Sequence, residues 1–409
     1  MLLKILTFTT LYPSRLRPQH GIFVETRLRK LVESGAVEAR VVAPCPWFPF
    51  ASPRFGHYAL FARQPHEEMR HGLHVDYPRY LQAPKIGMSV APLAMFTALL
   101  PVLRGQLRPG RDFDLIDAHY FYPDGVAAVL LGRALDRPVV VTARGSDLNV
   151  IAEHAVPRRW IRWAARQADG LVAVSHGLQR RLAALGVARE RVRVLRNGVD
   201  PALFRPADRD TARRALGLSG PTLLAVGNLV PLKRHRMMVE ALAGLPGIEL
   251  VIVGEGPERG AIEGLARERR IADRVRLLGH LPQDCLPEIY SAADLLVLVS
   301  THEGWPNVLL ESMACGTPVI ASDIDGIADI VASHEAGRIV HEPTPDRLAA
   351  AIRDLLAALP ARAATRAYAE RFDWQRTTDG QIALFREICE RRPDRQGAAH
   401  PAQRRRTRA

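Results

Sequence analysis

Three residues have types and a spacing that could do chemistry. Glu303 and Glu311 lie in the segment HEGWPNVLLESMACGTPVIASD, residues 302–323, with seven residues between them. An ionised carboxylate strengthens the hydrogen bonds that vicinal hydroxyl groups donate, so this pair suits a sugar. Lys233 ends the segment GNLVPLK and could act as the counter-charge to a diphosphate.

A helix must position the second carboxylate. Pro306 is favoured in a first turn, where its missing N–H costs nothing, so we expect a helix from near Trp305 or Pro306 that ends before Gly316. Glu303 then lies in the preceding loop. Positions eight apart differ by ~80° in azimuth at ~100° per residue, so Glu303 and Glu311 can border one cleft. The free N–H groups at the helix start suit a phosphate or sugar oxygen.

Glycines end the apolar segments that lead to these groups. Gly227 follows PTLLAV, and Gly254 and Gly256 follow or flank the end of IELVIV. Ligands of open parallel sheets bind beyond the carboxyl ends of strands, where glycine lets the backbone approach a diphosphate. Ordinary tight turns would use the same residues. The end of a P-loop motif and the dinucleotide fingerprint are both absent, which disfavours P-loop and dehydrogenase functions.

Short apolar segments alternate with helical stretches along the whole chain. Segments of this kind are typical of strands buried on both faces of parallel sheets. The sequence therefore predicts an α/β fold with two doubly wound domains. The predicted strands after the opening one lie in VEARVVAP, DLIDAHY, RPVVVTARG, GLVAVS and VRVLRNG, then in PTLLAVGNL, IELVIVGEG, RVRLLGHL, ADLLVLVS and TPVIASD.

Length and composition agree with two globular domains. The 409 residues are too many for one ordinary core. Asn197, Gly198, Pro201 and Pro206 interrupt regular structure before a predicted strand at Thr222, so the domains should meet there. With 47% hydrophobic and 24% charged residues, the chain is neither disordered nor collagenous.

Cysteine spacing and apolar stretches bear on location. The four cysteines, Cys45, Cys285, Cys315 and Cys389, show no CxxC spacing, so neither a zinc site nor a disulfide framework is expected, and a reducing cytoplasm fits. The opening MLLKILTFTTLYP is interrupted by Lys4 and threonines, which favours a first strand over a secretory signal. The apolar stretch 90–103 is shorter than the ~20 residues that span a bilayer, so no transmembrane helix is expected.

Segment 302–323 resembles the glutamate-seven-glutamate motif of family 4 glycosyltransferases. The resemblance extends over nearly all of the chain. The similar segments are GNLVPLK, VGEGPER, LLGHL, YSAADLLVLVS and LRNGVDPALFRP, with HGIFVETRLRKL, DLIDAHYFYPDG, VTARGSDLN and LVAVSHGLQRRL in the first half. It implies the GT-B architecture, in which two doubly wound, Rossmann-like domains face each other across a cleft. Residues 1–200 would bind the acceptor and residues 201–375 the nucleotide sugar. A helix at 376–392 would pack back on the first domain, and residues 393–409 would form a disordered basic tail.

The resemblance assigns donor-binding roles to residues of both halves. Glu311 would bind the ribose hydroxyls, Glu303 would lie beside the transferred sugar, and Lys233 would bind the diphosphate. Relatives often have Arg where this chain has Asn228, so one phosphate cation is absent, and Arg234 or Arg236 could replace it. The other implied donor-binding residues are Gly21, whose loop closes over the phosphates, Gly227, Gly254 and Leu281, of which the last two frame the base, and Gly304, Asn307 and Val308.

Three residues are implied on the acceptor side. His119 in DAHYFYPDG matches the histidine that relatives present to the reacting sugar, although a lone histidine is often structural. Arg144 stands where relatives often carry His, and it could contact an anionic acceptor or cap a helix. Asp147 follows in the same motif, TARGSDLN. His119, Lys233 and Glu303 are the implied catalytic residues.

The resemblance thus predicts a retaining, metal-independent hexosyltransferase without a cofactor. Its donor would be a UDP- or GDP-linked sugar and its acceptor a glycan or lipid-linked molecule in cell-surface polysaccharide or lipopolysaccharide biosynthesis. The leaving phosphate would assist deprotonation of the acceptor hydroxyl. We expect a cytoplasmic protein, with peripheral binding at the inner face of the plasma membrane as a further expectation. Asp323 and Asp325 come closest to a metal-binding motif, but we expect them to cap a helix instead.

Two other functions remain open. Nucleotide-sugar 2-epimerases share the GT-B architecture, but GWPNVLLE with its glutamate pair argues against them. The charge of +13 and the basic tail would suit a non-enzymatic binder of nucleic acid or of an anionic membrane. The tail has no aromatic residues to stack on bases, so nucleic acid is not expected as a partner.

Segment PRRWIRWAARQADG, residues 157–170, predicts a helix with a basic stripe. Arg158, Arg162 and Arg166 recur every four residues, with Arg159 beside them and Trp160 and Trp163 close by. Arginines and tryptophans of this kind can lie at an anionic bilayer surface. Alternatively, the tryptophans pack into the first domain and the arginines are solvated.

Overall fold

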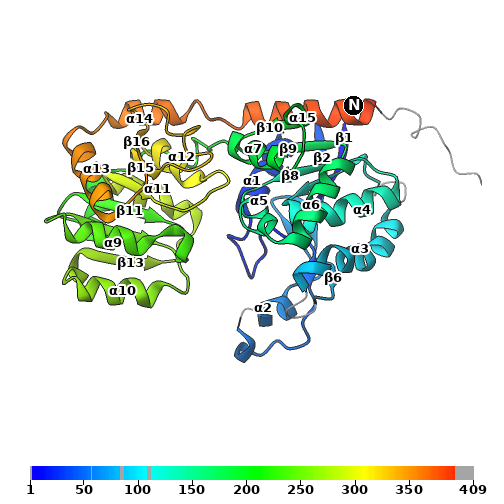
Figure 1. Ribbon diagram of the computed structural model, residues 1–409, viewed down its shortest axis with the longest axis horizontal. Helices are drawn as coiled ribbons and strands as arrows, with labels where there is room; N and C mark the ends of the chain where they lie inside the picture. Colours follow the sequence, from blue (N-terminus) through cyan, green and yellow to red (C-terminus); the bar gives the residue numbers. More distant parts are fainter. Residues whose placement is uncertain (1, 57, 83–86, 108–111, 392–409) are drawn as a thin grey trace, which may run out of the picture.

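The computed structural model describes residues 2–56, 58–82, 87–107 and 112–391. These residues form two domains, each built on a mostly or wholly parallel sheet between layers of helices (Figure 1). The predicted α/β fold with two doubly wound domains is confirmed.

The first sheet has eight strands in the order β10-β9-β8-β7-β1-β2-β5-β4. All neighbours are parallel except the β4–β5 hairpin at one edge, which the sequence did not predict. A short separate sheet pairs β3 with β6. The strands of this half are β1 (Leu3–Phe8), β2 (Val37–Val42), β3 (Cys45–Pro46), β4 (Glu67–Arg70), β5 (Leu73–Asp76), β6 (Arg79–Tyr80), β7 (Leu115–His119), β8 (Val139–Ala143), β9 (Gly170–Ala173) and β10 (Val192–Val194).

The second sheet has six parallel strands in the order β13-β12-β11-β14-β15-β16. It begins at Thr222, as the sequence predicted. Its strands are β11 (Thr222–Val226), β12 (Glu249–Val253), β13 (Val275–Gly279), β14 (Leu295–Leu298), β15 (Val319–Ser322) and β16 (Gly337–Val340).

Helices cover both faces of each sheet. Those of the first half are α1 (Ile22–Glu33), α2 (Tyr58–Arg63), α3 (Gly87–Gln106), α4 (Val126–Leu135), α5 (Ser146–Asn149), α6 (Ala155–Gln167) and α7 (His176–Ala184). Those of the second half are α8 (Arg209–Leu216), α9 (His235–Ala243), α10 (Arg259–Glu268), α11 (Leu286–Ala292), α12 (Asn307–Ala314), α13 (Pro345–Ala357), α14 (Arg362–Ala369) and α15 (Gln375–Glu390). Helix α12 begins after Pro306 and ends before Gly316, as predicted.

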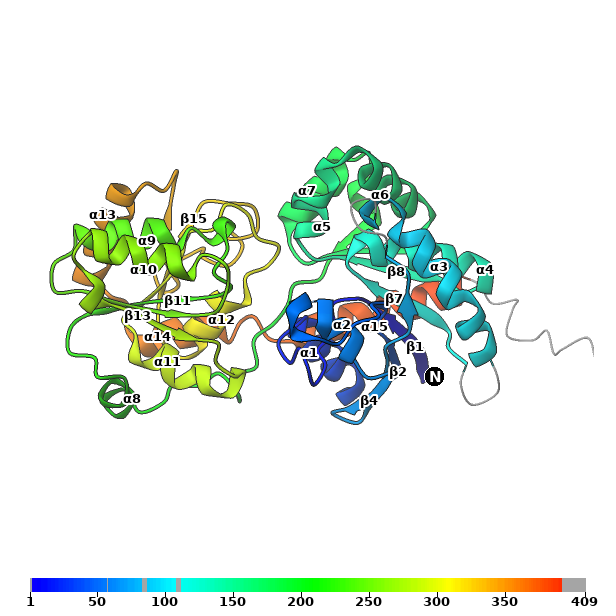
Figure 2. The same ribbon diagram turned by 90° about the horizontal axis from the view of Figure 1, so that it is seen from below.

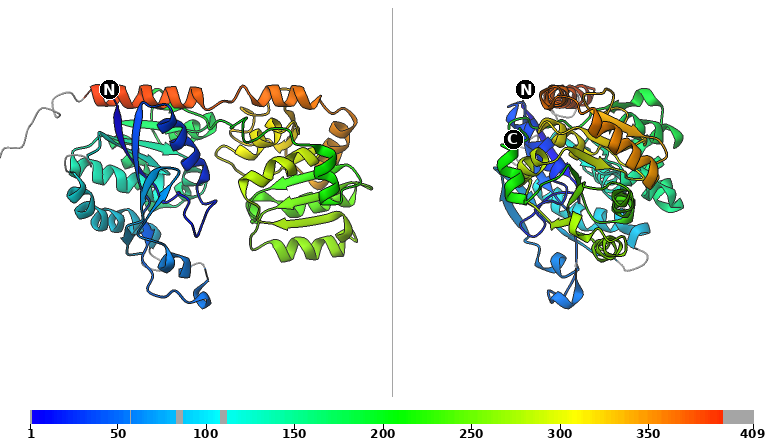
Figure 3. Two further views of the ribbon diagram at one scale, coloured as in Figure 1. Left: turned by 180° about the vertical axis from the view of Figure 1, so that it is seen from behind. Right: turned by 90° about the vertical axis from the view of Figure 1, so that its left-hand side faces the viewer.

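The last helix returns to the first domain. Figures 1 and 3 show α15 lying along the first domain while α14 stays on the second. Ile382, Phe385 and Ile388 of α15 join a buried cluster with Leu3 of β1 and Leu28 of α1. The expected return of the C-terminal helix is therefore observed, with bounds 375–390. The predicted basic tail, 393–409, lies outside the described residues.

The observed length of α3 contradicts the argument that the apolar stretch 90–103 is too short to cross a membrane. The helix has 20 residues because it extends beyond that stretch on both sides. One helix among the described residues, Gly87–Gly105, is therefore long and apolar enough to cross a membrane. Its Met95, Leu99 and Leu103 are fully buried against the first domain, which is also how a long core helix behaves.

Candidate active site

The two domains touch where the strands of both sheets end. Asn149 donates a side-chain hydrogen bond to the backbone carbonyl of Glu303 at 3.1 Å, and Asn197 donates one to Asn307 at 3.2 Å. A Cβ atom on Gly304 would lie 1.8 Å from the carbonyl oxygen of Arg144, so glycine is required where these loops meet. Figure 2 shows the second domain reaching toward α5 of the first in this region. Predicted donor and acceptor residues thus meet at one junction.

Glu303 and Lys233 lie together in the second domain. Lys233 ends a short 3-10 helix, Pro231–Lys233, in the loop after β11. Its Nζ atom lies 2.5 Å from Oε1 of Glu303. The backbone N–H of Thr301 donates to the carbonyl of Leu232, which ties the two loops together. Two of the three predicted catalytic residues therefore form a half-buried ion pair at the cleft.

Glu311 lies on α12 and is nearly buried. The Tyr290 hydroxyl donates to its Oε2 atom at 2.8 Å. Burial raises the pKa of Glu311 to about 7, although hydrogen bonds from Tyr290 and Gln283 act in the opposite direction. A cavity of about 70 Å³ adjoins the carboxylate, between Asn307 of the second domain and α1 of the first. Glu311 is thus a carboxylate that titrates near neutral pH at the domain junction.

The loops that carry Gly227 and Gly254 pack closely together next to Lys233. The N–H of Gly254 donates to the carbonyl of Gly279, and a Cβ on Gly254 would lie 1.9 Å from the carbonyl oxygen of Gly227. Gly254 has a φ of 149°, in the region that favours glycine. The loops after β11, β12 and β13 therefore pack backbone against backbone, and Leu281 follows, half-buried. Val308 is half-buried in the first turn of α12.

The missing phosphate cation has two candidate substitutes. Asn228 is exposed in the loop after β11. Arg234 is half-buried at the start of α9 with a φ of 51°, and Arg236 is exposed. We find no ion pair for either arginine within the described parts of the chain.

Gly21 lies where the first domain faces the second. It precedes α1 with a φ of 73°, and a Cβ there would lie 2.2 Å from the carbonyl oxygen of Leu11. Only glycine fits this close approach of two backbone segments. The loop that carries it leads from β1 to α1, at the carboxyl edge of the first sheet.

His119 is buried in a charged network at the end of β7. Its exposed fraction is 1%. Arg144 Nη2 lies 2.6 Å from Nδ1, and because arginine only donates, Nδ1 accepts and Nε2 donates to Asp117 at 3.2 Å. Burial lowers the pKa of His119 to about 4, so the ring is neutral. His119 is therefore buried next to Arg144 and does not lie on an open surface.

Asp147 and Arg144 are both buried just after β8. Asp147 is fully buried, and its carboxylate accepts backbone hydrogen bonds from Phe121 at 2.8 Å and Gly145 at 2.7 Å. It therefore holds the backbone around it in place instead of lining an open surface. Arg144 caps no helix, because its Nη1 donates to Asn197 at 3.2 Å and its Nη2 to His119. The helix-cap alternative is wrong.

The sequence missed the residues that complete this network. Gln381 of α15 is fully buried, accepts from Nε of Arg27 at 2.7 Å and donates to Asp117 at 2.9 Å. It thus joins α15 and α1 to the carboxylate that orients His119. A glutamine among the apolar residues of an amphipathic helix gives no sequence signal of such a role.

We expect Gln381→Ala to lower the free energy of unfolding by about 1–3 kcal/mol, because it leaves Arg27 and Asp117 buried with fewer partners. Denaturant unfolding monitored by circular dichroism measures this change. Gln375→Ala, an exposed position of the same helix, is the matched control and should change stability little. Equal effects of the two substitutions would contradict the buried role of Gln381.

No donor set for a metal was found at the junction among the described residues. Glu67, His74 and Asp76 form a cluster on the β4–β5 hairpin instead. Asp323 accepts from His341, and Asp325 pairs with Arg180 at 2.5 Å across the domains. The prediction that the two aspartates cap a helix is wrong, since β16 is the next element after β15. All four cysteines are free.

Both halves of the chain match models of known families. Residues 21–203 match the Glycosyltransferase Family 4 model, and residues 208–372 match Glycosyl transferases group 1. The chain is 36% identical over 330 residues to a D-inositol 3-phosphate glycosyltransferase of Acidothermus cellulolyticus, covering 73% of each chain. It is 31% identical over 343 residues to TuaC of Bacillus subtilis, provisionally named a teichuronic acid biosynthesis glycosyltransferase, covering 81% of this chain and 84% of TuaC.

Solved structures share the fold over nearly the whole chain. Sucrose-phosphate synthase from Thermosynechococcus elongatus has a TM-score of 0.76 at 21% identity, with 96% of this chain and 100% of that chain covered. Anabaena HepE in complex with UDP and glucose has a TM-score of 0.70 at 20% identity, with 95% and 100% covered. The chain therefore belongs to glycosyltransferase family 4, and it is a glycosyltransferase with the GT-B fold.

Proposed function

We propose that this enzyme transfers a hexosyl group from a nucleotide-diphosphate sugar, with retention and without a metal, to a glycan or lipid-linked acceptor. The observation that carries the proposal is the Lys233–Glu303 ion pair at the domain junction, next to Gly227, together with nearly buried Glu311 on α12. Residues 201–375 would bind the donor, and residues 1–200 with α15 would bind the acceptor. The reaction would serve cell-surface polysaccharide biosynthesis on the cytoplasmic side of the membrane.

Charge explains how these groups would act. Breaking the sugar–phosphate bond builds positive character at the anomeric carbon and negative charge on the leaving diphosphate. Lys233, the N–H groups at the start of α12 and the glycine-loop amides would stabilise that negative charge. Glu303 would face the transferred sugar, and Glu311 would accept hydrogen bonds from the ribose. The leaving phosphate would assist deprotonation of the acceptor hydroxyl.

Relatives guide the choice of substrates to test. HepE, a structural neighbour, was solved with UDP-glucose, which favours UDP-linked over GDP-linked sugars as the first donors to try. TuaC, by its name, supports polysaccharide biosynthesis. A thermal-shift screen against UDP- and GDP-linked sugars would identify the donor, because a ligand that binds only the folded state raises its stability with concentration.

We expect transfer and donor turnover to persist in EDTA, because no metal donor set was found at the junction among the described residues. The identified donor would be assayed with and without EDTA, and the anomeric configuration of the product would be read by NMR. Activity that is lost in EDTA and restored by Mg²⁺ or Mn²⁺ would overturn metal independence. Release of a free epimerised sugar without acceptor would favour the 2-epimerase alternative.

We further propose that the basic stripe of α6 binds an anionic membrane. Arg158, Arg159, Arg162 and Arg166 are exposed. Trp160 and Trp163 pack partly buried against the core, with ring centroids 5.6 Å apart, so the arginines alone would face the bilayer. Each Arg near such a surface adds roughly 1 kcal/mol, which salt screens.

Cosedimentation with anionic liposomes tests the stripe. Wild type should pellet and lose binding as salt rises, whereas Arg158/Arg159/Arg162→Glu should stay in solution. Arg267→Glu, an exposed position on α10, is the charge control and should pellet like wild type. Equal pelleting of the triple variant and wild type would leave the stripe a solvated surface.

A further inference from the structure

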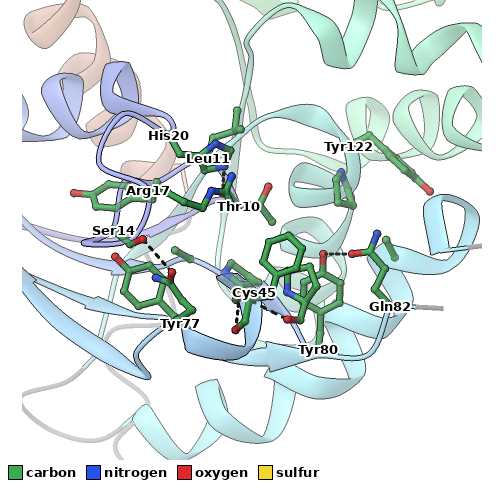
Figure 4. A pocket seen from close by; sticks show the side chains of 18 of the residues that line it. Thr10, Leu11, Ser14, Arg17, His20, Cys45, Tyr77, Tyr80, Gln82 and Tyr122 are labelled. Carbon is green, nitrogen blue, oxygen red and sulfur yellow. Dashed lines mark hydrogen bonds between the residues drawn. The ribbon is translucent and has the colours of Figure 1, made fainter. Parts of the chain in front are cut away.

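A second cavity, of about 350 Å³, lies at the carboxyl edge of the first sheet. The loops after β1 and β2 form its wall with parts of α2, β6 and α3 (Figure 4). Leu11 lines this cavity, and its backbone carbonyl packs closely against Gly21. The cavity therefore adjoins the loop of Gly21 in the first domain. Ligands of open parallel sheets bind at this edge of the sheet.

The cavity wall is largely aromatic. The Tyr77 hydroxyl lies 2.8 Å from the carbonyl oxygen of Pro13, and Tyr80 donates to Gln82 at 3.2 Å. Tyr12 is only 3% exposed, and its hydroxyl has no hydrogen-bond partner within the described chain. Glu25 and Arg70 both act on the pKa of Tyr12, so its hydroxyl lies toward that ion pair, and the Tyr12 ring is what borders the cavity.

The same wall carries a cation without a carboxylate. The Arg17 guanidinium lies 5.8 Å from the centre of the Phe61 ring, and no ion pair to it was found in the described parts of the chain. Arg40 and Arg70 of the same domain, by contrast, pair with Asp76 and Glu25. Charges shielded from water are normally paired, so Arg17 is the exception to explain.

The titratable groups around Arg17 do not neutralise it. His20 donates from Nε2 to the carbonyl of Thr10 at 3.0 Å, and burial lowers its pKa to about 4, so it is neutral. Burial raises the pKa of the Cys45 thiol, which is therefore neutral too.

The acidic groups nearby already have partners. Asp124 accepts from Thr9 and from both the N–H and the hydroxyl of Thr10. Glu68 accepts from Tyr77 and pairs with Arg15. Arg79 adds a second cation behind the wall, and its Nη1 atom has no partner among the described residues. The cavity thus has an uncompensated positive charge.

We propose that this cavity is an acceptor subsite for an anionic group, a phosphate or a carboxylate, on the sugar that receives the transferred residue. Arg17 would bind the anion through its planar pair of N–H donors, and the tyrosine rings would pack on the sugar. The proposal rests on the proposed function and names the acceptor chemistry of the same enzyme.

Calorimetric titration of the full-length protein tests this subsite. Saturating UDP would first fill the donor site, so that added anions report on the cavity. The probes are inorganic phosphate, glucuronate and neutral glucose. Wild type should bind phosphate, glucuronate or both, and glucose much more weakly. Binding of phosphate alone or glucuronate alone would identify which anion the subsite selects.

Three variants make the result specific. Arg17→Gln should weaken anion binding by about 10- to 100-fold, through loss of charged hydrogen bonds. Arg17→Lys keeps the charge and should keep part of the affinity. Arg104→Gln, which removes an exposed arginine of α3, is the matched control and should bind like wild type.

Each contrary outcome has a definite meaning. Anion affinity that is unchanged in Arg17→Gln, or glucose binding as tight as anion binding, would overturn the subsite. Absence of anion binding to wild type that binds UDP would also overturn it while leaving the donor site intact. Failure of wild type to bind UDP or any nucleotide sugar would instead count against the proposed function. Thermal melting of each variant confirms that it is folded.

Discussion

Lys233→Ala should lower kcat by about 10²–10³-fold, the typical cost of removing one group that stabilises charge in a transition state. Lys233 is the cation that contacts Glu303 at the junction, and its charge matters most as the diphosphate leaves. Its loss would also leave the Glu303 carboxylate next to the phosphates without a counter-charge. Steady-state kinetics with the identified donor gives kcat and KM separately.

The pattern of the kinetic change matters more than its size. A rise in KM with unchanged kcat would mean that Lys233 only binds the ground state, and the assignment would be wrong. Arg267→Ala removes an equal charge from an exposed position of α10 and should leave both constants unchanged. Loss of activity in that control would point to an unspecific effect of charge.

Glu311→Ala should weaken nucleotide binding at pH 8 by about 30- to 1,000-fold, which corresponds to about 2–4 kcal/mol for two charge-assisted hydrogen bonds. The carboxylate is only 9% exposed, so water would replace the lost contacts poorly. Isothermal titration with UDP and GDP measures the change. Unchanged affinity for the nucleotide would remove Glu311 from the ribose.

The pKa of Glu311 adds a pH signature to that result. Because burial raises this pKa to about 7, the carboxylate is ionised at pH 8 and mostly protonated at pH 6. The ionised form accepts both ribose hydrogen bonds, so wild-type affinity should fall below pH 7, by up to about tenfold per pH unit. Glu311→Gln should bind more weakly than wild type at pH 8 and lose this dependence.

Stability should show the opposite trend with pH. The folded state holds the Glu311 proton more tightly than the unfolded state, so this group destabilises the apo protein as pH rises from about 4.5 to about 7. Glu311→Gln should therefore be more stable than wild type at pH 8. Denaturant unfolding at pH 5 and pH 8 would show whether the difference grows with pH.

Local signals explain what the sequence could predict. Pro306 and Gly316 mark the limits of α12, and continuous apolar segments mark the strands from Thr222 onward, because each signal depends on neighbours in the chain. The meeting of Lys233 with Glu303 followed from two motifs at the carboxyl ends of one parallel sheet. Their roles came from the family resemblance and remain proposals.

Contacts between distant segments account for what the sequence did not show. Gln381 meets Asp117 across 264 positions, and neither residue type nor spacing announces that contact. Burial of His119 depends on Arg144, which belongs to another strand's loop. The unpaired state of Arg17 can be recognised only when the partners of its neighbours are known. Such features arise from packing, which periodicity and motif do not encode.

Because α15 completes the core of the first domain, that domain cannot finish folding until the C-terminal part of the chain has been synthesised. Side chains that close the core of the first domain, among them Phe385, lie some 190 residues beyond β10. At about 5–20 residues per second, a ribosome needs roughly 10–40 s to make that stretch. The first domain therefore leaves the ribosome with an apolar face exposed. That face stays exposed until α15 has been synthesised. Truncation before α15 would therefore destabilise the first domain, although that domain is synthesised first.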